Sequence, residues 1–127
     1  HIQSGSDYTC NTNPPTYPDG LDVEVFTSMA LRNAVKSASS QSEREHVTAW
    51  MYNPKNGLCC KNYESLFDAS NLRLTVDYPD DAEAVRKVIA ALKSPLDADY
   101  FDILRAISDN SSITLMNQHV RNETFLN

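Results

Sequence analysis

A strand pattern that runs straight into a helix pattern is the feature that most constrains the fold of this chain. Residues 72–76, LRLTV, alternate apolar and polar side chains as a half-buried strand does. Pro79 then falls in the first turn of a helix. The apolar side chains of that helix recur at helical spacing in Val85, Val88, Ile89 and Leu92. A strand followed at once by a helix is typical of folds in which helices cover a sheet.

The first half of the chain has the same alternation. Residues 21–26, LDVEVF, have the pattern of a strand, and Thr27 can cap the helix that follows. The apolar stripe expected on that helix is Leu31, Ala34, Val35 and Ala38. The sequence therefore predicts a strand and a helix with one buried face.

A second helix is expected after this one. Ser42 and Glu45 have the spacing of a capping box, which predicts a helix over residues 43–52. A turn at residues 53–57 and a strand at residues 58–63 should follow.

The end of the chain adds one more predicted helix, over residues 99–108, with Asp99 as its cap. Its inward residues should be Ile103, Leu104 and Ile107. The tail, residues 113–127, is apolar in places and is expected to pack on something. Interleaved strands and helices predict an α/β layer architecture, which by itself says little about function.

Composition and charge exclude several classes of protein. The chain has 127 residues, of which 41% are hydrophobic, and a net charge of −6, which suits one compact domain. It has no apolar run of membrane-spanning length and no signal segment, so we expect a cytoplasmic protein. The acidic balance, without a lysine and arginine cluster, argues against nucleic-acid binding. The chain opens at His1 without a methionine, so we expect it to begin in the middle of a fold.

Cysteine usage does not suggest a disulfide framework. The chain has three cysteines, Cys10, Cys59 and Cys60, and two of them are adjacent. An odd number without metal-site spacing predicts reduced cysteines that lie on strands and are largely buried.

An acidic pattern marks the strand predicted at residues 21–26. Asp22 and Glu24 would point to one face of that strand, about 7 Å apart, while the valines next to them would point to the other. On this pattern alone, an ordinary solvated strand face is the simpler interpretation. A pair of carboxylates looking into one binding space is the alternative.

Asp77 is the most informative single residue. It stands at the carboxyl end of the strand predicted at residues 72–76, directly before a helix, which is where open α/β sheets form their ligand crevice. A carboxylate there could share a magnesium ion with substrate phosphates. The alternative is that Asp77 only organises the Asp-Tyr-Pro-Asp turn.

The remaining candidates do not complete an active site. His46 is expected near a helix N-terminus, where it could contact an anion or simply pack. Phosphate-cradling glycines are absent, because Gly5, Gly20 and Gly57 lie far apart in the sequence. The residues alone therefore predict a crevice without a complete set of catalytic groups.

Three motifs, read in order, carry a resemblance to a known family. They are residues 11–26 (NTNPPTYPDGLDVEVF), Ser42–Thr48 (SEREHVT) and Leu72–Asp81 (LRLTVDYPDD). They resemble the C-terminal half of the cytidylyltransferase family that includes the SpsF-like spore coat polysaccharide biosynthesis proteins and is related to CMP-KDO and CMP-sialic acid synthetases. The third motif resembles the Thr-Val-Asp-x-Pro-Glu-Asp pattern of that family, with Asp80 in place of Glu. The tail at residues 117–123 resembles a common ending of these proteins.

The resemblance implies a fold and an activity. The fold would be the Rossmann-like layered fold of nucleotide-diphospho-sugar transferases, with a mixed sheet and without the N-terminal nucleotide-binding half. Residues 1–127 would be a single domain, the acceptor-side and dimerisation half. The parent reaction transfers a cytidylyl group from CTP to a sugar hydroxyl and releases pyrophosphate, with magnesium on the phosphates.

The resemblance also assigns residues. Asp77 would be one of two magnesium carboxylates. The residues expected to line the acceptor-sugar side or lie near that pocket are Asp19, Asp22, Glu24, Arg44, Glu45 and His46.

One departure from the family bears on activity. The family's CTP-holding loop and the Gly-Asp-x-Pro motif with the other metal carboxylate would precede this region, and neither occurs in these 127 residues. We therefore expect the chain alone to be inactive, to bind no magnesium and to form a homodimer, with a sugar as a possible ligand. The alternative is a stand-alone binding or assembly module that kept the fold without the chemistry. An unrelated α/β domain with chance motifs is a third reading.

Overall fold

The computed structural model describes residues 1–46, 48–110 and 112–113. The chain forms two compact units, and each unit combines segments that are distant in the sequence. Unit 1 contains His1–Thr16 and Asp22–Phe67, and unit 2 contains Tyr17–Leu21 and Asp68–Asn127.

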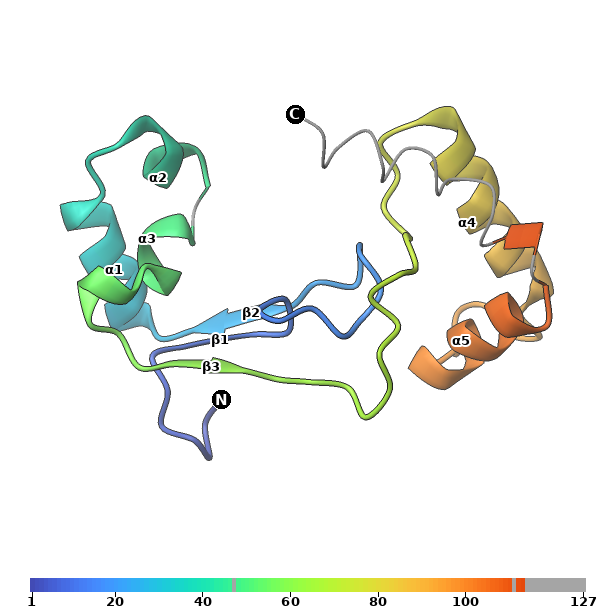
Figure 1. Cartoon of the computed structure of the whole chain (residues 1–127), viewed down its shortest axis with the longest axis horizontal. Coiled ribbons are helices and arrows are strands. Elements are labelled where there is room, and N and C mark those ends of the chain that lie inside the picture. Colours follow the sequence, from blue (N-terminus) through green and yellow to red (C-terminus); the bar gives the residue numbers. More distant parts are fainter. Residues whose placement is uncertain (47, 111, 114–127) are drawn as a thin grey trace. The chain divides into compact units, whose positions relative to one another are not determined.

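A small mixed sheet forms the centre of unit 1. Its strands are β1 (Tyr8–Cys10), β2 (Glu24–Phe26) and β3 (Cys60–Asn62), in the order β2-β1-β3. β1 pairs antiparallel with β2 and parallel with β3, as Figure 1 shows. A mixed sheet with helices beside it confirms the predicted α/β class.

The described residues of unit 1 include three short α-helices. Helix α1 (Ser28–Ser37) starts as predicted, because the Thr27 side chain accepts a hydrogen bond from the backbone N–H of Ala30. Helices α2 (Gln41–Glu45) and α3 (Ala49–Tyr52) follow, and a 3₁₀ turn η1 (Pro54–Asn56) confirms the turn predicted at residues 53–57.

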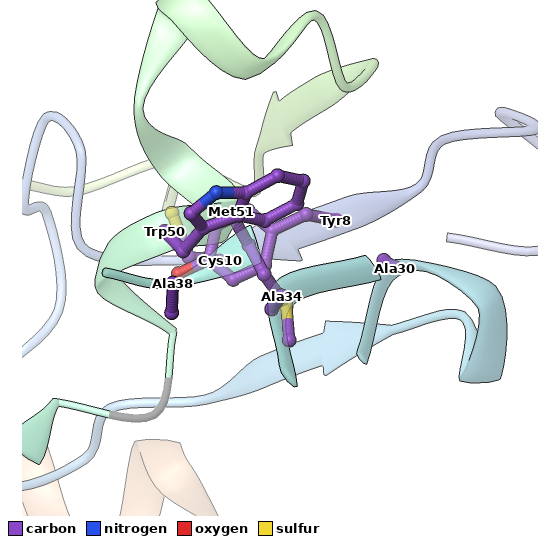
Figure 2. Close-up of a cluster of buried hydrophobic side chains, with 7 residues drawn as sticks. All are labelled: Tyr8, Cys10, Ala30, Ala34, Ala38, Trp50 and Met51. Atoms are coloured by element: carbon purple, nitrogen blue, oxygen red, sulfur yellow. The ribbon is translucent and has the colours of Figure 1, made fainter. Parts of the chain in front are cut away.

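The core of unit 1 lies between β1, α1 and α3 (Figure 2). Its buried side chains are Tyr8, Cys10, Ala30, Ala34, Ala38, Trp50 and Met51. On α1 the inward stripe is made of alanines, whose small side chains let the helix approach the sheet closely. The expected stripe was therefore partly wrong: Val35 is 70% exposed and Leu31 is only half-buried, while Ala30 was missed.

The predicted helix over residues 43–52 is not continuous. The capping box is formed by Ser40 and Glu43, two residues earlier than Ser42 and Glu45. Helix α2 then ends with His46 as its C-cap, so α3 is a separate turn. Both serines have an acidic residue three positions later, so the local pattern could not choose between them.

Two burial predictions for unit 1 were also wrong. Cys10 is buried, but Cys59 and Cys60 are exposed, and all three are free thiols. Val23 and Val25 are 56% and 43% exposed, so they do not form the inward face of a strand. The strand itself is shorter than predicted and begins at Glu24.

Two helices pack against each other in the described part of unit 2. Helix α4 (Pro79–Ala91) has Pro79 in its first turn, as predicted, and α5 (Tyr100–Ser108) begins at the predicted cap Asp99. The buried core of the unit consists of Ala84, Val88, Ile107 and Ile113. Leu72, Leu74, Leu92 and Ile103 pack against it.

The strand predicted at residues 72–76 is not one. The segment makes a single isolated bridge, between Arg73 and Asp19, with backbone hydrogen bonds from Asp19 N to Leu72 O and from Leu74 N to Asp19 O. Its partner segment contains Pro18 and Gly20 and turns away, so the ladder cannot extend.

No helix within residues 1–46, 48–110 and 112–113 is long and apolar enough to cross a membrane. The predicted packing of the tail concerns residues that, apart from Ile113, lie outside the described part of the chain.

Candidate functional site

A guanidinium in contact with three carboxylates is the main polar cluster described in unit 2. Arg73 Nε and Nη2 each donate to one oxygen of Asp81 at 3.1 Å. Arg73 Nη1 donates to Asp19 Oδ2 at 3.0 Å, and Nη2 donates to Asp77 Oδ2 at 2.7 Å. We call these four residues the Arg73 cluster.

The cluster has a buried centre and a more exposed rim. The side chains of Arg73 and Asp81 are 10% and 0% exposed, whereas those of Asp19 and Asp77 are 40% and 63% exposed. A buried carboxylate needs a paired charge and satisfied hydrogen bonds, which the two-point contact with Arg73 supplies. The hydrogen bond to Asp81 also raises the pKa of Arg73, so the guanidinium stays charged.

Asp81 also builds the start of α4. Its Oδ2 atom accepts hydrogen bonds from the backbone N–H groups of Asp77 and Tyr78, both at 3.1 Å. These donors precede the helix, where backbone N–H groups lack helical partners, and the helix dipole favours a negative charge there. The turn-organising role that the sequence left open for Asp77 is thus filled by Asp81, while the Asp77 side chain contacts Arg73.

Asp19 joins the cluster because Gly20 follows it. Gly20 has φ +99°, and a Cβ at this position would lie 2.6 Å from Thr75 N and 2.7 Å from the carbonyl carbon of Leu74. Only glycine allows the two backbones to come this close. The two backbone hydrogen bonds between Asp19 and residues 72–74 then fix where its carboxylate lies.

Glu24 in unit 1 is held by two hydroxyl groups. The hydroxyl of Tyr8 donates to Glu24 Oε1, and Thr48 Oγ1 donates to the same atom at 2.8 Å. Burial of Tyr8, together with its hydrogen bond to Glu24, raises the pKa of the tyrosine well above its usual value. Glu24 therefore connects β2 to the chain segment before α3.

The other predicted residues of unit 1 are exposed. Arg44 lies on α2 and helps to line a pocket of about 280 Å³. The residues that line this pocket are Leu31, Ala34, Val35, Ala38, Glu43 and Arg44. Glu45 ends α2, and His46 is its C-cap, so the expected place of His46 near a helix N-terminus was wrong. Asp22 is exposed as well.

The structure thus sorts the predicted residues into two groups. Asp19 and Asp77, assigned to the sugar and to the metal respectively, lie on the two Nη atoms of one guanidinium in unit 2. The remaining predicted residues, Asp22, Glu24, Arg44, Glu45 and His46, belong to unit 1. Arg73 and Asp81 were missed, although both stand in the third motif, four residues before and four residues after Asp77.

The carboxylates of the Arg73 cluster do not form a magnesium site. Among the described residues, no group of three or more His, Cys, Asp or Glu side chains could hold a metal. The carboxylates of the Arg73 cluster come together around a guanidinium, which takes the central position. These residues alone do not fit a magnesium ion.

Comparison with known proteins gives one informative structure. No model of a known protein family matches the sequence. An uncharacterized protein from Methanocaldococcus jannaschii, MJ1063, is 31% identical over 111 residues, which cover 84% of this chain and 44% of that protein. A cytidylyltransferase from Leptospira borgpetersenii serovar Hardjo-bovis superposes with a TM-score of 0.83 at 25% identity, over 90% of this chain and 48% of that one.

This chain has part of a cytidylyltransferase fold. It spans about half the length of the proteins it matches, with 44% of one and 48% of the other. The match supports the cytidylyltransferase family and confirms the predicted partial, Rossmann-like α/β architecture with a mixed sheet.

Proposed function

We propose that this chain is the acceptor-side part of an SpsF-like cytidylyltransferase that activates a sugar for surface polysaccharide synthesis. In the parent reaction, the sugar hydroxyl oxygen forms a bond to the α-phosphorus of CTP. The bond from that phosphorus to the bridging oxygen breaks, pyrophosphate leaves, and the hydroxyl proton is released. Magnesium, when bound, would neutralise charge on the phosphates.

The observation that carries this proposal is the structural match at a TM-score of 0.83, which covers 90% of the chain. Fold alone does not establish function, because one fold hosts many chemistries. The order of the three motifs adds a second line of support, and residues of the first and third motifs build specific features: the Gly20 approach, the Asp81 helix start and the Arg73 cluster.

The residue roles in this proposal follow the motifs. Asp77 would supply one magnesium carboxylate, and the second would come from a Gly-Asp-x-Pro segment that these 127 residues do not contain. Asp19, Asp22 and Glu24 would line the acceptor-sugar side. Arg44, Glu45 and His46 would lie near that pocket.

The proposal includes the state of the chain by itself. Without a CTP-holding loop, and with Asp77 paired to Arg73, the chain alone should neither bind magnesium tightly nor turn over CTP. We also propose that it forms a homodimer. In unit 1, Tyr63, Leu66 and Phe67 are 67%, 95% and 65% exposed, and exposed apolar groups of this kind favour association.

A pyrophosphate-release assay tests the function. It compares residues 1–127 with the longest natural polypeptide that contains them. Each protein is mixed with CTP, magnesium and either 3-deoxy-octulosonate or N-acetylneuraminate. We expect no release from residues 1–127 and CTP-dependent release from the longer polypeptide. In the latter, Asp77→Asn should lower the rate at least about 100-fold if Asp77 contacts the metal.

Glu83→Gln is the matched control, because Glu83 lies on α4 and its contact with Lys87 is a solvent-exposed pair. Its activity should equal that of the unmodified protein. Release of pyrophosphate by residues 1–127 alone would refute the proposed inactivity. A longer polypeptide that binds neither CTP nor sugar acid would favour the binding or assembly module instead.

A further inference from the structure

The carboxylate of Glu24 is held in one orientation, although this residue is exposed. The hydroxyl of Tyr8 and Thr48 Oγ1 both donate to the same oxygen, Oε1. The other oxygen, Oε2, accepts no hydrogen bond from the residues that the structure describes. A glutamate at a surface usually keeps its rotamer freedom. Here two donors on one oxygen fix the direction in which the other oxygen points.

Both donors are anchored by the core of unit 1. Tyr8 lies on β1, is 2% exposed and belongs to the buried cluster. Thr48 directly precedes α3, whose residues Trp50 and Met51 belong to the same cluster. Because the core is closely packed, neither hydroxyl can move far. The position of the Glu24 carboxylate is therefore set by the core and not by the side chain of Glu24 alone.

The need of the buried Tyr8 hydroxyl for a partner explains only one of these two contacts. A buried hydroxyl needs a hydrogen-bond partner, and Glu24 supplies it. The bond from Thr48 lies at the surface, where water would satisfy that hydroxyl almost as well. Thr48 stands in the second motif and Glu24 in the first, so this bond links two segments on which the resemblance rests. Folding alone does not account for the second donor.

A fixed carboxylate oxygen at the surface suits a ligand that carries hydroxyl groups. Hydroxyl groups donate strong, charge-assisted hydrogen bonds to a carboxylate. An acceptor that is already ordered loses less side-chain entropy when the ligand binds. We infer that Tyr8 and Thr48 are positioning residues, which orient Glu24 so that its Oε2 atom accepts a hydrogen bond from a hydroxyl group of the acceptor sugar. The inference rests on the proposed function for the sugar itself.

The test measures the affinity of residues 1–127 for 3-deoxy-octulosonate and for N-acetylneuraminate without nucleotide, by saturation-transfer difference nuclear magnetic resonance. Thr48→Val keeps the branched shape of the side chain and removes the hydroxyl. It should weaken binding about three- to tenfold, the range expected for one hydrogen bond. Thr48→Ser keeps the hydroxyl and should stay within about twofold of the unmodified chain.

Tyr52→Phe is the matched control. Tyr52 packs beside Tyr8, with ring centroids 6.3 Å apart, and its hydroxyl makes no hydrogen bond to the described residues. Removal of this hydroxyl should leave sugar affinity unchanged, whereas Tyr8→Phe should weaken it as Thr48→Val does. Circular dichroism establishes that each variant is folded.

A double-mutant cycle separates positioning from a structural role. In a chain that already carries Glu24→Ala, there is no carboxylate to orient, so Thr48→Val should weaken sugar binding no further. In the longer polypeptide, Thr48→Val should raise the KM for the sugar and leave the KM for CTP unchanged. A purely structural role would change both constants.

Unchanged sugar affinity in folded Thr48→Val would overturn the inference, and so would an equal further loss in the Glu24→Ala background. Absence of binding of both sugar acids to the unmodified chain would overturn it as well. Because no nucleotide is used, these outcomes are independent of the pyrophosphate assay. Sugar binding that depends on Thr48 and Glu24, without CTP-dependent release from the longer polypeptide, would refute only the proposed function.

Discussion

Replacing Gly20 by alanine should destabilise unit 2 far more than the same change at Gly57. Both glycines have positive φ, +99° and +69°. They differ in their surroundings: an added Cβ at Gly57 would meet nothing within 4 Å, whereas at Gly20 it would lie 2.6 Å from Thr75 N and 3.0 Å from Leu74 O. Gly57→Ala is therefore a control, because it places an L-residue at positive φ without a steric clash.

The expected size follows from these two contributions. An L-residue at positive φ costs about 1–2 kcal/mol, and this applies at both positions. The clash at Gly20 is with backbone atoms, which cannot move aside as a side-chain end can, and overpacking of this kind costs about 1–3 kcal/mol. Gly20→Ala should therefore lower the free energy of unfolding by about 2–5 kcal/mol, against about 1–2 kcal/mol for Gly57→Ala.

Urea denaturation followed by circular dichroism measures the free energies, and amide hydrogen exchange locates the damage. The amide of Leu74 donates to Asp19 O at 2.7 Å, so it should be protected in the unmodified chain. A local loss of about 3 kcal/mol would speed its exchange roughly 100-fold in Gly20→Ala. Equal stability losses at the two glycines, or unchanged exchange at Leu74, would refute the close backbone approach that places Asp19 beside Arg73.

Three further predictions concern stability. Tyr8→Phe should remove a pH dependence of the free energy of unfolding. The pKa of Tyr8 is raised in the folded state, so above about pH 10 the folded chain keeps a proton that the unfolded chain loses. The stability of the unmodified chain should therefore fall by up to about 1.4 kcal/mol per pH unit in that range, and the stability of the variant should not. Asp81→Asn should cost about 3–5 kcal/mol in urea denaturation because it removes one partner of a buried ion pair, whereas Glu83→Gln, in an exposed pair, should cost less than about 0.5 kcal/mol. Ser40→Ala should lower stability by about 1 kcal/mol and Ser42→Ala by almost nothing, because only Ser40 caps α2. Thermal melting measures both variants, and a larger loss in Ser42→Ala would favour the capping box of Ser42 and Glu45 that the sequence predicts.

Local rules predicted the parts of the fold that depend on neighbours in the sequence. The starts of α1 and α5 were confirmed, at Thr27 and Asp99, because each depends on one side chain and the next few backbone N–H groups. The start of α4 was confirmed at Pro79, because the fixed φ of proline suits the first turn of a helix. The α/β class was confirmed for a similar reason: the change from period two to helical period is visible in the sequence.

Features that depend on distant segments could not be predicted. Residues 72–76 have a strand pattern, but a strand needs a partner to form a ladder, and the partner at Pro18–Gly20 provides a single bridge. Val35 fits the helical stripe of α1, yet the face that packs on the sheet is the alanine face. In both cases the alternation of residue types was read correctly, and the packing partner decided the outcome.

The residues of the candidate site differ in whether folding alone explains them. Gly20 and Asp81 have roles that folding alone explains, since one allows a close backbone approach and the other pairs with a buried guanidinium. Two motif positions could therefore persist in a chain that had lost its chemistry. Asp77 is different: at 63% exposure, its contact with Arg73 should contribute no more than about 1 kcal/mol to stability. Because this carboxylate contributes so little to folding, Asp77→Asn can test activity without a change in stability. A large loss of activity in this variant, with an unchanged free energy of unfolding, would indicate that Asp77 takes part in catalysis.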